Sequence, residues 1–110
     1  MMYCDYKDGK WHAPQIVPYG PMEFHPSSKV FHYGQAVFEG MKAFKDDNGQ
    51  VHLFRPEQNF ERINKSSIRL AIPEFPKNLF FESLETLIKL DYDWIKPGQG
   101  NSLYIRPFVI

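Results

Sequence analysis

The sequence predicts a small α+β fold in which hairpins form a mixed or antiparallel sheet and two helices pack against it. Two turn signals, DG at residues 8–9 and DDNG at residues 46–49, lie between short alternating segments typical of hairpins. Two segments with helical spacing follow between residues 56 and 91, and the alternating run SLYIRPFVI closes the chain at residues 102–110. The predicted elements come in the order strands, helices and a final strand, and this order is typical of an α+β fold.

The composition fits one globular domain. Hydrophobic residues make up 43% of the 110 residues and aromatic residues 16%, which argues against disorder. Thirteen basic and thirteen acidic residues cancel, so charge gives no reason to expect nucleic acid or an anionic membrane as a partner. The lone Cys4 has no internal disulfide partner, which suits a reducing compartment.

The predicted strands occupy most of the first half of the chain. Residues 2–11, MYCDYKDGKW, form a hairpin around Asp8-Gly9, and residues 14–26, with four prolines, form an extended connector. Residues 41–44 are expected to form a strand that returns through QVHLF at residues 50–54.

The predicted helices follow the second hairpin. Pro56 suits the first position of a helix that ends before Pro73. From Lys77 to Asp91, apolar residues recur at helical spacing while acidic and basic residues take the other face. A loop, KPGQGN, then leads to a final strand over residues 102–110.

Arg106 is the least expected residue of that final strand, because the run around it is apolar and contains no acid. Alternation on a strand puts Tyr104, Arg106 and Phe108 on one face. They fit either an aromatic pocket whose arginine binds a carboxylate or a buried structural ion pair with an acid from another segment. Composition alone somewhat favours the ion pair.

Other candidate residues give weaker signals. In HYGQAVFEG, Tyr33 and Phe38 lie beside glycines that allow close approach of the backbone to a ligand, but the residues alone favour a core loop with a tight turn. Glu39 could act as an acid–base residue, but a structural hydrogen bond with loop amides is favoured. Arg55, Arg62 and Arg69 recur every seven residues and could bind phosphate or form a solvated or ion-paired face. The four histidines lack metal-ligand spacing, so no metal site is predicted.

The order of three motifs resembles the N-terminal part of a branched-chain amino acid aminotransferase. These motifs are HYGQAVFEGMKAF, then LFRPEQNFERINKSSIRLAIPEFP, then SLYIRPFVI, and the resemblance covers residues 11–110. That family belongs to fold type IV of the pyridoxal-phosphate enzymes. The resemblance implies that residues 1–110 are a truncated small N-terminal domain, without the domain that carries the cofactor lysine.

The resemblance also assigns residues. The arginine of NFER, Arg62, would bind the phosphate of pyridoxal 5'-phosphate, whereas Arg55 and Arg69 match structural positions. Tyr33, Phe38, Tyr104 and Arg106 would line the substrate pocket, some of them across a homodimer interface. The resemblance places the Schiff-base lysine beyond residue 110, so no catalytic residue is assigned, and Lys42, which matches a non-catalytic position, is expected to point away from the pocket.

The implied activity of the intact protein is transamination between leucine, isoleucine or valine and 2-oxoglutarate, in the cytoplasm. The domain alone is expected to be inactive. Two alternatives within the superfamily are a D-amino acid aminotransferase and an aminodeoxychorismate lyase. A third alternative, of another class, is a catalytically inactive binding or dimerisation module.

Overall fold

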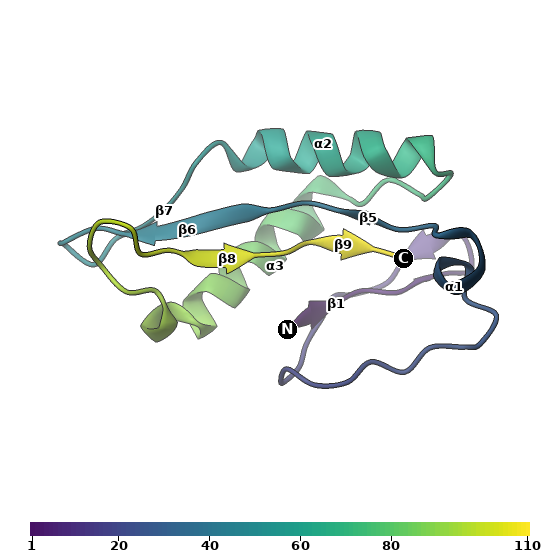
Figure 1. Ribbon diagram of the computed structural model, residues 1–110, viewed down its shortest axis with the longest axis horizontal. Helices are drawn as coiled ribbons and strands as arrows, with labels where there is room; N and C mark the ends of the chain where they lie inside the picture. Colours follow the sequence, from purple (N-terminus) through teal and green to yellow (C-terminus); the bar gives the residue numbers. More distant parts are fainter.

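The computed structural model describes residues 1–110, and its strands form four small sheets in which every ladder is antiparallel (Figure 1). A single isolated parallel bridge joins Lys45 to Pro97. In chain order the elements are β1 Met2–Tyr3, β2 Tyr6–Lys7, β3 Lys10–Trp11, β4 Gln15–Ile16, α1 Lys29–Tyr33, β5 Val37–Phe38, β6 Met41–Lys45, β7 Val51–Leu53, α2 Pro56–Arg69, α3 Lys77–Leu90, the 3-10 helix η1 Tyr92–Trp94, β8 Leu103–Ile105 and β9 Phe108–Val109. The predicted α+β class is confirmed.

The two predicted hairpins and the two long helices are present. β2 pairs with β3 around Asp8 and Gly9, whose φ angles of 54° and 77° suit a tight hairpin turn. β6 pairs with β7 across the DDNG turn. Proline opens α2, as predicted, and α3 ends one residue before the predicted Asp91.

Three features differ from the prediction. The prediction of two helices missed α1, a single turn that ends at Gly34 in the left-handed conformation with φ 60°. The connector after Pro14 contains β4, which pairs with β1. The final strand is divided, because Pro107 has no amide hydrogen for a ladder: β8 pairs with β6, and β9 pairs with β5.

The core lies between the helices and one face of the strands. Val37 packs with Ile63 of α2, and Met41 packs with Phe80 and Leu84 of α3. In Figure 1, α3 lies behind the strands β6, β8 and β9. Ala43 is fully buried on the same face.

The opposite face of β5, β6, β8 and β9, here called the open face, carries no helix. Cross-strand pairing places Phe38 opposite Phe108 and Lys42 opposite Tyr104, so each pair shares this face. Its side chains are exposed although many are aromatic. The open-face residues are Phe38, Lys42, Phe44, Tyr104, Arg106 and Phe108.

Candidate functional site

A buried carboxylate between β5 and β6 binds an arginine of α2. Glu39 is 5% exposed, because it alternates onto the core side of the strand with Val37 and Met41. Arg62 donates from Nε to Glu39 Oε2 at 2.7 Å and from Nη2 to Oε1 at 2.6 Å. The expected hydrogen bond from a loop amide is also present, since the Gly40 N–H donates to Oε1 at 2.9 Å. The sequence pattern missed the pairing with Arg62.

Glu39 and Arg62 each stabilise the charged form of the other. Hydrogen bonds from Arg62 lower the pKa of Glu39 below its ordinary value, against the opposing effect of burial, and the bond to Gly40 lowers it further. The same carboxylate raises the pKa of Arg62. A guanidinium has five N–H donors. Two donate to Glu39, and the Arg62 side chain is 67% exposed, so donors remain for a ligand.

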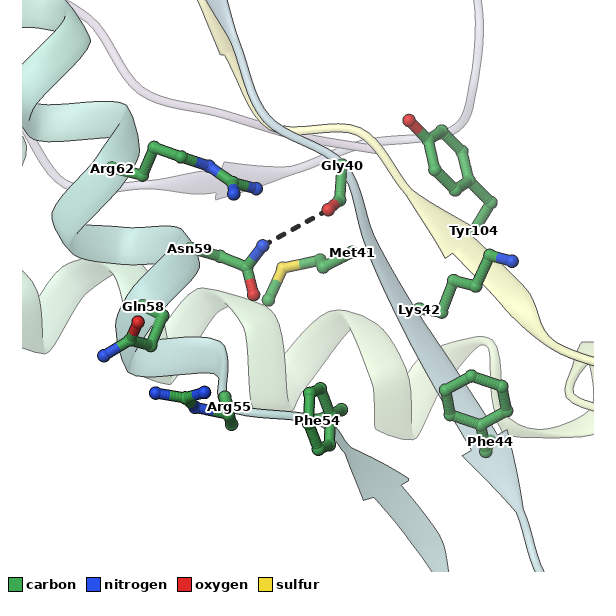
Figure 2. Close-up of a pocket in the computed structure, with 10 residues that line it drawn as sticks. All are labelled: Gly40, Met41, Lys42, Phe44, Phe54, Arg55, Gln58, Asn59, Arg62 and Tyr104. Carbon is green, nitrogen blue, oxygen red and sulfur yellow. Dashed lines mark hydrogen bonds between the residues drawn. The ribbon is translucent and has the colours of Figure 1, made fainter.

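Arg62 also lines an open groove of about 450 Å³ that includes Gly40, the residue just before β6 (Figure 2). Residues of α2 form one wall and residues of the open face form the other, as Figure 2 shows. Its lining residues are Gly40, Met41, Lys42, Phe44, Phe54, Arg55, Gln58, Asn59, Arg62 and Tyr104. Three of these are cationic and none is acidic, so an anion such as a phosphate group would meet no acidic lining residue beside Arg62. Figure 2 shows Lys42 on the opposite side of β6 to Arg55 and Arg62.

Arg106 has no acidic partner. Its Nε and Nη2 donate to the Tyr104 hydroxyl oxygen at 3.0 and 2.6 Å, and its guanidinium carbon lies 4.6 Å from the centre of the Phe38 ring. It is exposed, and no carboxylate forms a salt bridge with it. The buried structural ion pair, which composition favoured, is therefore wrong for Arg106. An aromatic surface holds the guanidinium, and part of its donor set remains free.

The structure brings three of the four expected substrate residues together. Phe38, Tyr104 and Arg106 form one contact cluster on the open face. Tyr33 lies apart from them at the end of α1, where it is 81% exposed and its ring packs edge-on against His32. The chain alone therefore contains an incomplete version of the expected pocket.

The expected orientation of Lys42 is wrong. We expected it to point away from the pocket face, but it pairs directly with Tyr104 and lines the groove. The reason is the two-residue period of a strand, which puts Phe38, Gly40 and Lys42 on the same side. Its side chain is exposed and makes no hydrogen bond.

The remaining arginines and histidines lie outside this cluster. Arg55 precedes α2 in the left-handed conformation and lines the groove, while Arg69 ends the helix. His52 contacts Asp46 at 2.7 Å in the second hairpin. No three metal-ligating side chains lie together, and no helix is both long and apolar enough to cross a bilayer.

Comparison with known proteins gives relatives over the full chain. It is 52% identical over 111 residues to branched-chain-amino-acid transaminase 1 and 48% identical to branched-chain-amino-acid aminotransferase 2, both of Bacillus subtilis. It is 50% identical to the branched-chain-amino-acid aminotransferase of Mycolicibacterium smegmatis. Each alignment covers 100% of this chain but 30–31% of the relative. No protein-family model matches. The resemblance predicted from the motifs is confirmed.

Proposed function

We propose that this chain, a homologue of the branched-chain aminotransferases, is the N-terminal domain of a transaminase of fold type IV. The intact enzyme would move an amino group between leucine, isoleucine or valine and 2-oxoglutarate. Identity of about one half over the whole chain carries the assignment to this reaction, and the chain spans about 30% of the length of the relatives it matches.

We assign the cofactor phosphate to Arg62. When bound, pyridoxal 5'-phosphate would supply the electron sink for reaction at the substrate α-carbon. Support comes from the donors of Arg62 that Glu39 leaves free, at a groove with no unpaired acid. Glu39 would hold the guanidinium plane in place, and the fork of donors would match a phosphate dianion.

We assign the substrate side chain to the cluster of Phe38, Tyr104 and Arg106. A branched aliphatic side chain would contact the aromatic rings, and the side-chain carboxylate of glutamate or 2-oxoglutarate would accept hydrogen bonds from Arg106. The free donors of Arg106 and its lack of an acidic partner support this dual use. The rings still contact the flat guanidinium when no acid is bound.

Tyr33 would act in a homodimer, where it would reach the pocket of the second subunit. Its exposure and its separation from Phe38 support a role outside its own pocket. We assign no catalytic lysine within the chain, since Lys42 matches a non-catalytic position in the family. A cytoplasmic location would suit the unpaired Cys4.

Product analysis with the full-length protein tests this assignment. With pyridoxal phosphate, L-leucine and 2-oxoglutarate, we expect stoichiometric formation of glutamate and of the 2-oxo acid of leucine. Reaction of D-amino acids in place of L-leucine would favour a D-amino acid aminotransferase, and pyruvate release from aminodeoxychorismate would favour the lyase. Cofactor-independent folding with no turnover of any of these substrates would favour an inactive binding or dimerisation module.

A further inference from the structure

Gly40 is in contact with the tyrosine that holds Arg106. A Cβ atom built at Gly40 would lie 2.5 Å from the Tyr104 hydroxyl oxygen, 3.2 Å from Cζ and 3.3 Å from Cε2. The first of these distances is far inside van der Waals contact. Figure 2 shows the Tyr104 ring extending across the strand toward Gly40.

Lack of space, and not backbone conformation, is what requires glycine here. Gly40 is absent from the glycines with positive φ, so an alanine would meet no backbone strain at this position. Tyr104 is 51% exposed, and its ring can therefore move outward into solvent when a methyl group appears beneath it. The fold should survive such a change, whereas the position of the hydroxyl should not.

The position of the Tyr104 hydroxyl determines that of Arg106. Two donors of one guanidinium converge on this single oxygen, at 3.0 and 2.6 Å. The Phe38 ring, at 4.6 Å from the guanidinium carbon, supports one flat face but does not fix the direction of the donors. A shift of the Tyr104 hydroxyl therefore changes the direction in which the remaining N–H donors of Arg106 point.

We propose that Gly40 is a positioning residue for the carboxylate-binding end of the pocket: the space above its Cα admits the Tyr104 hydroxyl, which aims Arg106 over Phe38. This inference rests on the proposed function, in which Arg106 binds the side-chain carboxylate of glutamate. Gly40 does not touch the substrate in this role. It acts through Tyr104.

Gly40→Ala in the full-length protein tests the proposal, with Gly20→Ala as the control. Gly20 also lacks a positive φ, and its Cβ would meet nothing within 4 Å. We expect kcat/KM for glutamate to fall by about ten- to a hundredfold in Gly40→Ala, because small misplacements of an orienting group have effects of this size. The value for leucine should change much less, and Gly20→Ala should match the wild type.

A double-mutant cycle with Tyr104→Phe tests the route. If Gly40 acts through the hydroxyl, Gly40→Ala should cost little further glutamate activity once that hydroxyl is absent. Additive losses would overturn the proposal, as would equal losses for glutamate and leucine in Gly40→Ala.

A crystal structure of Gly40→Ala separates this inference from the proposed function. We expect the Tyr104 ring to be displaced and at least one of its two hydrogen bonds with Arg106 to be lost. Retention of both bonds at their present lengths would overturn the proposal whatever the kinetics. A wild-type protein without transaminase activity would refute the proposed function, and the variant structure would still decide whether Gly40 positions Tyr104 and Arg106.

Discussion

Glu39→Gln isolates the charge of the buried carboxylate while keeping its shape. Glutamine can still accept the Gly40 N–H at one oxygen, but it cannot accept both Arg62 donors or neutralise the guanidinium. The carboxylate is 5% exposed, so its two hydrogen bonds to a charged donor resemble buried charge-assisted bonds, worth about 1.5–3 kcal/mol each.

Solvent reduces that value, because the Arg62 side chain is 67% exposed and exposed ion pairs contribute only about 0.2–1 kcal/mol. Since one half of the pair is buried and the other is hydrated, we expect Glu39→Gln to lower the free energy of unfolding at pH 7 by about 1–2 kcal/mol. Urea unfolding followed by circular dichroism measures this loss. Glu85→Gln, which removes the carboxylate of the exposed Lys89–Glu85 pair on α3, should change the stability far less.

The pH dependence of the free energy of unfolding provides a second test of the role of Glu39. Hydrogen bonds from Arg62 lower the folded-state pKa of Glu39 below the ordinary value near 4.5. The contribution of ionised Glu39 to the free energy of unfolding is therefore complete above about pH 4.5, and it is lost as the pH falls through the folded-state pKa. Glu39→Gln should remove this part of the acid dependence. Equal stability of Glu39→Gln and the wild type at pH 7, with unchanged acid sensitivity, would refute the reasoning about this pair.

Three further predictions concern the proposed enzyme. Arg62→Ala in the full-length protein should weaken pyridoxal-phosphate binding about ten- to a hundredfold, measured by equilibrium dialysis, whereas Arg69→Ala in the same helix should not; equal affinities would move the phosphate site elsewhere. Arg106→Leu should lower kcat/KM for glutamate at least about tenfold and that for leucine much less, measured in single turnovers of each half-reaction; equal losses would mean that Arg106 only supports the pocket. The 110-residue chain by itself should form no glutamate above the free-cofactor background, and turnover by this chain would contradict our proposal that the catalytic lysine is not among residues 1–110.

Local signals predicted the hairpins and the long helices well. Asp8-Gly9 and the proline that opens α2 act through their own backbone geometry, which does not depend on distant residues. By contrast, α1 has five residues and no buried side chain, so it has little periodicity to detect. Pairing of β1 with β4 depends on two-residue strands with a hairpin between them, which no local pattern specifies.

The sequence predicted which of the candidate residues share one face of a strand, but not which residues bond to one another. Alternation correctly put Tyr104, Arg106 and Phe108 on one face. The bond between Glu39 and Arg62 spans 23 positions and depends on how α2 packs against β5, which sequence spacing does not give. One signal was available: Glu39 alternates with the buried Val37, and a buried carboxylate needs a cation.

The divided final strand has a consequence for the growing polypeptide. β8 pairs with β6 about 60 residues earlier in the chain, and β9 pairs with β5 about 70 residues earlier. The Glu39 N–H donates to Pro107 O between the two ladders at 2.8 Å. At translation speeds of about 5–20 residues per second, these partners are synthesised about 3–14 s after β5 and β6. During that interval Val37 and Met41 lack the neighbours that later cover them, Val109 and Ile105. The nascent chain therefore exposes apolar side chains to which a chaperone can bind, and this exposure ends when the last strand, β9, pairs with β5.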